Sequence, residues 1–198
     1  MSMDWPVVNY SYPPRLKEWY KEGILFRLWF NLYRERCLFD ERMFSSAQIP
    51  HSGPVKNAFG LHEFFMGTQY IDAGYEATCY YREVECKACF EKAKELFGGN
   101  EAAKFITPNT ERGGRPPDLL VFDPRTGAFR FVECKFRGER PTKAQPKRFA
   151  EIEDFLNRYP PPCKRALTSS DPRWKVLFPP LEPGKWIHMA RLVPAAHL

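Results

Sequence analysis

One stretch of the chain decides the fold class, and it reads PDLLVFDPRTGAFRFVECK over residues 117–135. Residues 119–122 form a compact apolar run, and residues 129–135 are rich in aromatic and β-branched side chains. The turn-forming residues 124–127 separate the two runs. This pattern predicts a β-hairpin.

Three charged side chains of this hairpin form the candidate site. Alternate residues of a strand share a face, so Glu133 and Lys135 point one way while Val132 and Cys134 point the other way into a core. Asp118 begins the neighbouring strand, and we expect its carboxylate to lie close to that of Glu133. Two adjacent carboxylates need a cation or a shared proton, and oxygen ligands suit Mg²⁺ or Mn²⁺. A lysine beside them suits the positioning of a water or of a phosphate.

Helical and extended segments are predicted on both sides of the hairpin. Apolar periodicity and end signals predict four helical segments, over residues 14–44, 60–73, 76–97 and 143–158. Gly23 interrupts the first segment, Gly98-Gly99 ends the third, and Thr142 is the predicted N-cap of the fourth. Short strands are predicted over 103–107, 174–178 and 186–192, an extended segment over 1–13, and loops over 45–54 and 109–117. Helix, hairpin and helix together predict an α/β or α+β core with an N-terminal helical addition.

Length and composition restrict the class of protein further. The chain has 198 residues, of which 43% are hydrophobic, so it can bury a core of its own and is not generally disordered. No apolar run is long enough to cross a bilayer, and the first residues lack the pattern of a secretory signal. We therefore expect an intracellular protein, in cytoplasm or nucleus, that has reduced thiols and no membrane partner.

Cys86 and Cys89 have the spacing of a zinc-binding pair. A structural zinc site needs two more ligands, usually a second close pair, but the chain has no second CxxC motif and its four histidines are scattered. Ordinary buried thiols on one helix face are the favoured interpretation. A zinc-stapled adaptor is the alternative.

The positive charge of the chain is concentrated around the hairpin. The whole chain has a net charge of +6, and residues 112–148, with ten Lys or Arg against four Asp or Glu, contain all of that surplus. Phosphate binding is one interpretation, and a solvated basic loop is the other. The candidate phosphate-binding residues are Arg112, Arg115, Arg137, Arg140, Lys143 and Lys147.

The hairpin and its flanks resemble a known family. GGRPPDLLVF at 113–122, FVECK at 131–135 and GERPTKAQ at 138–145 are together similar to the VRR-NUC branch of the PD-(D/E)xK nucleases, which includes the Fanconi-associated nuclease and many phage and bacterial enzymes. The resemblance covers about residues 110–157.

The chain departs from the family pattern beside the motif. Two prolines stand where one is usual, Phe136-Arg137 replaces the Gly-Pro often found after the lysine, and Pro141 replaces a leucine. None of these departures changes the charged residues of the motif, although they could alter the loop that tracks the substrate.

The resemblance implies a fold and an activity. The fold is a restriction-endonuclease-like mixed sheet flanked by helices over residues 59–198, with an N-terminal helical extension over 1–58. The activity is Mg²⁺- or Mn²⁺-dependent hydrolysis of DNA phosphodiester bonds, with branched, flapped or junction DNA and a role in DNA repair as family properties. RNA as a substrate and a homodimer stay open. A DNA-binding module that keeps the fold without catalysis is the alternative function.

The resemblance also implies roles for individual residues. Asp118 and Glu133 would bind the metal together with the backbone carbonyl of Cys134. Lys135 would orient the attacking water, and Gln145 would steady Lys135 or that water.

The family uses one more glutamate, on the helix before the Pro-Asp strand. Glu83 is our preferred residue, because the predicted helix places it on an apolar face where a carboxylate needs a partner. The alternatives are Glu63, Glu76 and Glu85, or that none of these glutamates completes the site.

Overall fold

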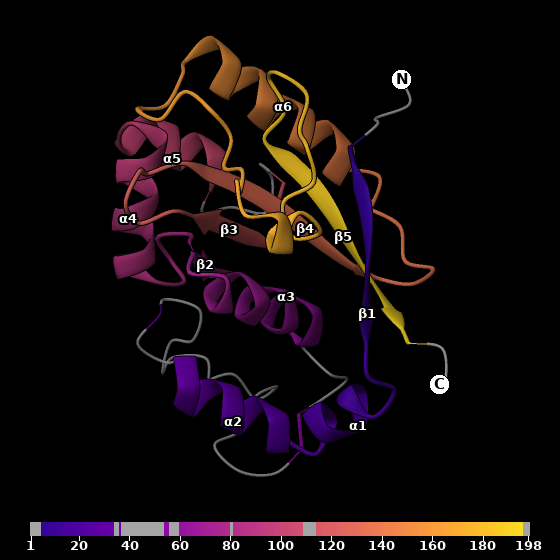
Figure 1. Ribbon diagram of the computed structural model, residues 1–198. Helices are drawn as coiled ribbons and strands as arrows, with labels where there is room; N and C mark the ends of the chain where they lie inside the picture. Colours follow the sequence, from indigo (N-terminus) through magenta and orange to yellow (C-terminus); the bar gives the residue numbers. More distant parts are fainter. Residues whose placement is uncertain are drawn as a thin grey trace.

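A five-stranded mixed sheet forms the centre of the protein (Figure 1). The computed structural model describes residues 5–33, 36, 54–55, 60–79, 81–108 and 114–195. The strands are β1 (Val7–Tyr12), β2 (Glu76–Thr78), β3 (Leu119–Phe122), β4 (Phe129–Phe136) and β5 (Ile187–Pro194), and they lie in the order β1-β5-β4-β3-β2. β2, β3 and β4 pair antiparallel, whereas β5 is parallel to both β4 and β1. A parallel pair needs a crossover connection, and α6 (Gln145–Arg158) lies in the connection between β4 and β5.

Helices cover both faces of the sheet (Figure 1). One face is covered by α3 (Leu61–Asp72), beyond which lie α1 (Leu16–Lys21) and α2 (Ile24–Tyr33). The other face is covered by α4 (Lys87–Phe97), α5 (Asn100–Ile106) and α6. No helix in the described ranges is long and apolar enough to span a membrane.

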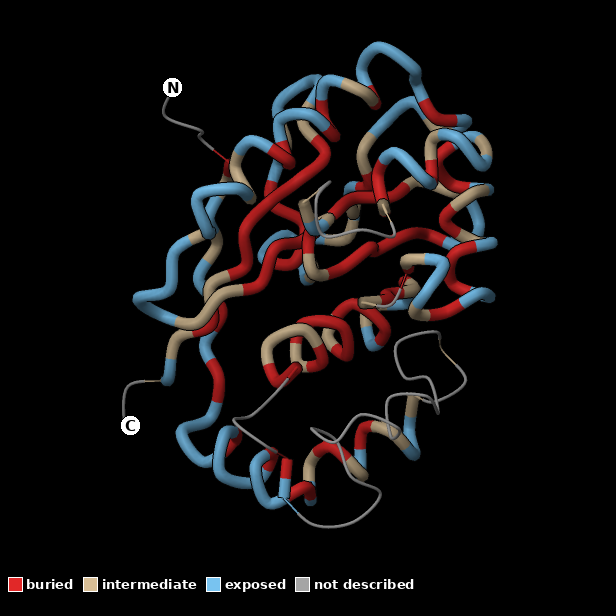
Figure 2. The backbone as a smooth tube through the Cα atoms, turned by 180° about the vertical axis from the view of Figure 1, so that it is seen from behind, coloured by how far each residue is buried: buried red, intermediate tan, exposed pale blue. Residues whose placement is uncertain are grey.

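The hairpin supplies side chains to two hydrophobic clusters, one on each face. Val132 and Cys134 belong to the cluster under α3, while Phe129 and Phe131 belong to the cluster under α4 and α6. Figure 2 shows β3 and most of β4 buried. Burial on both faces explains why residues 119–122 are apolar without alternation. The predicted hairpin, with Val132 and Cys134 facing a core, is confirmed.

The predicted helix over residues 76–97 is wrong in its first part. Residues 76–78 form β2 and pair with β3, residues 83–85 form a turn, and α4 begins only at Lys87. Pairing with the buried edge of β3 outweighs the local helical pattern here. The predicted stop is confirmed, because Gly98 ends α4 with a φ of 91°.

Two predicted strands are also wrong. Residues 100–106 form the helix α5, which follows α4 directly, and residues 172–174 form a short 3₁₀ helix, η4 (Pro172–Trp174). Thr142 is not the N-cap of α6, since that position is Ala144.

Three other predictions are confirmed within about two residues. The helix predicted over 60–73 is α3, and the strand predicted over 186–192 is β5. The predicted interruption at Gly23 separates α1 from α2.

The N-terminal segment is built into the sheet. β1 pairs with β5 over its whole length, and the buried rings of Tyr20 and Phe26 pack against Phe64 of α3. The expected domain boundary between residues 58 and 59 falls outside the described residues. The described part of the predicted extension nevertheless supplies one edge strand of the sheet.

Candidate active site

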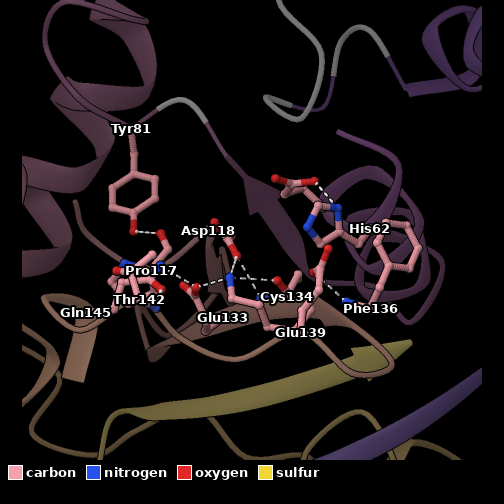
Figure 3. A network of polar contacts seen from close by, with 12 residues as sticks. His62, Tyr81, Pro117, Asp118, Glu133, Cys134, Phe136, Glu139, Thr142 and Gln145 are labelled. Atoms are coloured by element: carbon pink, nitrogen blue, oxygen red, sulfur yellow. Dashed lines mark hydrogen bonds and ion pairs between the residues drawn. The ribbon is translucent and has the colours of Figure 1, made fainter. Parts of the chain in front are cut away.

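The backbone around the hairpin places Asp118 opposite Glu133. β3 and β4 pair Leu119 with Val132, and the next step of that register brings Asp118 against Glu133. The backbone N–H of Cys134 donates to Asp118 Oδ2 at 2.8 Å (Figure 3). On the other side, the Tyr81 hydroxyl donates to the carbonyl of Pro117. The register therefore brings Asp118 and Glu133 to the same end of the hairpin, where hydrogen bonds hold the Asp118 carboxylate and the Pro117 carbonyl.

Glu133 has one satisfied oxygen and one unsatisfied oxygen. Its side chain is 0% exposed. Oε1 accepts from Gln145 Nε2 at 2.6 Å and from the ammonium group of Lys135 (Figure 3). Oε2 is buried and has no hydrogen-bond partner. A buried carboxylate oxygen without a partner is costly, so this atom is a natural place for a cation to bind.

Lys135 lies between the two carboxylates. Its Nζ contacts Glu133 Oε1, lies 3.5 Å from Asp118 Oδ2, and donates to the Cys134 carbonyl at 3.1 Å. Burial disfavours the charged form, but Asp118 and Glu133 outweigh that effect and raise the pKa of Lys135. The ammonium group therefore stays protonated and partly neutralises the carboxylate pair.

The carboxylates themselves have perturbed proton affinities. Burial, together with the charge of Asp118, raises the pKa of Glu133 to about 8. Burial, together with the charge of Glu63, raises the pKa of Asp118. The three carboxyl groups thus lie near enough to repel one another, and a divalent ion would relieve that repulsion.

The third carboxylate comes from α3. Glu63 lies in the first turn of that helix and lines a cavity of about 160 Å³ together with Asp118 and Tyr81. Burial on its own would raise the pKa of Glu63, but the neighbouring His62 outweighs burial and lowers it. Glu63 therefore stays an ionised carboxylate that faces the same space as Asp118.

The preference for Glu83 as the helix glutamate is not supported. Glu83 lies in the turn before α4 and is exposed, so the apolar helix face on which the preference rested does not exist. Glu76 lies in β2 and pairs with Arg36 at 2.8 Å. Glu85 lines the same cavity as Asp118 but is paired with Arg82. Of the four glutamates considered, Glu63 is the one that a helix positions against Asp118.

The donor set fits a hard divalent cation. Glu133 Oε2, the carboxylate of Asp118 and the carbonyl of Cys134 are oxygen donors of the kind that Mg²⁺ and Mn²⁺ prefer. Within the part of the chain that the structure describes, no three His, Cys, Asp or Glu side chains are already gathered in metal-binding geometry. The site therefore offers a two-carboxylate centre with Glu63 nearby, rather than a closed three-residue cage.

Gln145 differs in one detail from its expected role. Its Nε2 donates to Glu133, and its Oε1 accepts from the backbone N–H of Thr142 at 2.8 Å (Figure 3). Gln145 thus holds the carboxylate of Glu133 and connects it to the loop before α6. It shares Glu133 Oε1 with Lys135, so any effect of Gln145 on Lys135 passes through that oxygen.

The basic residues near the hairpin divide into two groups. Arg137, Arg140 and Lys143 are exposed in the loop between β4 and α6, Lys147 is exposed on α6, and Arg115 lines the cavity. Arg112 lies outside the described residues. Arg148 is buried and donates to the carbonyls of Phe105 and Ile106 at the end of α5. Arg148 therefore stabilises the fold and is not placed to contact a phosphate.

Two residues of the site were missed by sequence reasoning. Tyr81 has no motif around it, and only its hydrogen bond to Pro117 identifies it. His62 is one of four scattered histidines with no motif around it, yet its Nδ1 lies 2.8 Å from Glu63 Oε2. Its position next to Glu63 in the sequence was the only available signal.

Cys86 and Cys89 have a structural explanation. Both are buried, and Cys86 Sγ accepts from the backbone N–H of Cys89 at 3.3 Å, which makes Cys86 the N-cap of α4. The described residues bring no third zinc ligand to the pair. The spacing of three residues therefore reflects helix capping.

Comparisons with known proteins give no independent identification. Neither protein-family models nor curated proteins nor solved structures include a match to this chain.

Proposed function

We propose that the protein is a divalent-metal-dependent nuclease of the restriction-endonuclease-like, VRR-NUC type, which hydrolyses DNA phosphodiester bonds. The observation that carries the proposal is the buried, partnerless Oε2 of Glu133, next to Asp118 and Lys135 at one end of the hairpin. The mixed sheet with helices on both faces fits the fold class that the sequence motif implies.

Each residue of the cluster would have a distinct task. Asp118, Glu133 and the Cys134 carbonyl would hold Mg²⁺ or Mn²⁺, which when bound would polarise the phosphate and activate a water molecule. Lys135, which stays protonated, would orient that water or stabilise charge on the phosphate. Gln145 would keep Glu133 Oε1 engaged, so that Oε2 faces the metal.

The exposed basic residues would bind the nucleic-acid backbone. Arg137, Arg140 and Lys143 belong to the loop between Phe136, the last residue of β4, and Gln145, the first residue of α6. Phosphates bound along this loop would be led to the carboxylates. Flapped, branched or junction DNA is the substrate class that we propose by family resemblance.

The test is cleavage of supercoiled, linear, flapped and branched DNA with Mg²⁺ or Mn²⁺. We expect the wild type to cut at least one substrate and Lys135→Ala to be slower by about 100-fold or more. Lys92→Ala is a matched control, because Lys92 lines a cavity beside the hairpin turn at Pro124, at the opposite end of the hairpin from Asp118. Equal background for wild type and Lys135→Ala on every substrate would refute catalysis.

One observation favours a second candidate, a nucleic-acid-binding module without catalysis. Lys135 already pairs with both Asp118 and Glu133, so the cluster has an internal cation. This candidate predicts DNA binding that weakens steeply with salt, and no metal-dependent cleavage. Binding assays across a salt series, run beside the cleavage assay, separate the two functions.

A further inference from the structure

The ring of Phe136 connects the N-terminal segment to the site. Phe136, half-buried at the end of β4, stacks on His62 with 4.8 Å between ring centroids and 26° between ring planes (Figure 3). Its ring also meets Tyr12 of β1 edge-on at 6.4 Å, and the ammonium group of Lys17 from α1 lies 5.1 Å from the ring centroid. Phe136 is one of the residues that depart from the family pattern, in which a glycine is usual at this point.

The partner of Phe136 leads directly to a carboxylate of the site. His62 Nδ1 lies 2.8 Å from Glu63 Oε2 (Figure 3). Glu63 in turn faces Asp118 across the cavity that both residues line. A stacked imidazole cannot rotate freely, so the Phe136 ring restricts the orientation of the group that contacts Glu63.

We propose that Phe136 and His62 are positioning residues, which hold the Glu63 carboxylate beside Asp118, and that β1 and α1 support the site through Phe136. This inference rests on the proposed function, since it assigns Glu63 to the site at which the metal would bind. Removing a residue that orients a metal-binding side chain typically weakens metal affinity by about 10–100-fold. The N-terminal segment is then part of the active site rather than an appendage to it.

Mn²⁺ affinity, measured by the loss of the free-ion paramagnetic resonance signal, tests the proposal on the full chain. We expect Phe136→Leu to weaken Mn²⁺ binding about tenfold. Phe155→Leu is the matched control: the change is the same, and Phe155 is also half-buried, but its ring stacks on Phe105 of α5. Phe155→Leu should bind Mn²⁺ like the wild type. Tyr12→Leu should weaken binding in the same direction as Phe136→Leu, but less.

The double variant His62→Ala/Phe136→Leu shows whether Phe136 acts through His62. We expect His62→Ala alone to weaken Mn²⁺ binding about tenfold, and Phe136→Leu to add almost nothing in that background. Thermal unfolding of each variant identifies any loss that comes from global destabilisation.

The outcomes separate this inference from the proposed function. A wild type that binds no Mn²⁺ would overturn both. Wild-type binding that is unchanged in Phe136→Leu, or a full further tenfold loss in the double variant, would overturn only the positioning role. An equal loss in Phe155→Leu would overturn it as well, because the effect would then belong to any lost ring stack.

Discussion

The pH dependence of stability follows from the burial of Glu133. The pKa of this carboxyl group is about 8 in the folded protein, against an ordinary value of 4.5, because of burial and the adjacent Asp118. The folded state therefore binds more protons than the unfolded state between pH 4.5 and pH 8, and stability falls as pH rises through this window. The raised pKa values of Asp118 and His62 act in the same direction.

The remaining charged groups of the site do not reverse the sign. The raised pKa of Lys135 keeps it protonated throughout the window, and the lowered pKa of Glu63 acts below pH 4.5. From the two pKa values of Glu133, the metal-free protein should lose about 3 kcal/mol of unfolding free energy between pH 5.5 and pH 8. For a chain of this length, that corresponds to a fall in Tm of roughly 6–12 °C.

Urea unfolding with a chelator present, at pH 5.5, 6.5, 7.5 and 8, measures the effect directly. Glu133→Gln should flatten the dependence, because the amide does not titrate and can still accept from Lys135 and Gln145. Glu153→Gln is the matched control: Glu153 is another buried glutamate, but Lys185 and the backbone N–H of Trp186 donate to its carboxylate. This control should lower stability while it keeps the slope with pH.

A divalent ion should reverse the effect, since it binds the ionised carboxylates. With saturating Mn²⁺, the wild type should keep its stability up to pH 8, and its Mn²⁺ affinity should rise with pH. Metal-free stability that is constant or rises between pH 5.5 and pH 8 would refute the reasoning. So would a Glu133→Gln variant with the same slope as the wild type.

Three further predictions concern neighbouring residues. Tyr81→Phe removes the hydrogen bond to the Pro117 carbonyl, so urea unfolding should show an unfolding free energy lower by about 1–2 kcal/mol and Mn²⁺ titration should show weaker binding. Unchanged values in both assays would contradict a role of Tyr81 in holding Asp118. Arg130→Met leaves the carbonyls of Leu167 and Pro179 without their buried donor, and should lower the unfolding free energy in urea by about 2–4 kcal/mol. A decrease of less than about 1 kcal/mol would show that this donor is dispensable. Arg140→Ala should reduce the magnitude of the slope of log DNA affinity against log salt concentration by about 1 without changing the fold. An unchanged slope would show that Arg140 does not contact a phosphate.

The hairpin was predictable because its information is local. Residues 119–122 and 129–135 have strong β preference and are joined by a short connection over residues 123–128, so their pairing and the meeting of Asp118 with Glu133 follow from neighbours in sequence. β2 was not predictable in this way. Glu76–Thr78 is only three residues long, and it becomes a strand because β3 offers it an edge more than forty residues away.

The same contrast explains the assignment of the helix glutamate. Glu83 was preferred on the phase of a helix that does not begin until Lys87. Glu63 could be placed only by knowing that α3 packs across β3 and β4, which is a tertiary fact with no local signature. The role of Phe136 is similar, since its three aromatic and cationic partners come from β1, α1 and α3.

The surplus charge of residues 112–148 becomes informative once burial is known. Arg130 and Arg148 are buried and donate to backbone carbonyls, so these two side chains stabilise the fold and are not available to a ligand. The exposed remainder includes Arg137, Arg140 and Lys143, in the loop between β4 and α6. Lys135, one residue before the loop, and Gln145, at its end, both contact Glu133 Oε1, so an anionic strand that binds along the loop would lie close to that carboxylate. The number of positive charges indicated an anionic partner, but it is the position of the exposed ones that connects such a partner to the candidate chemistry.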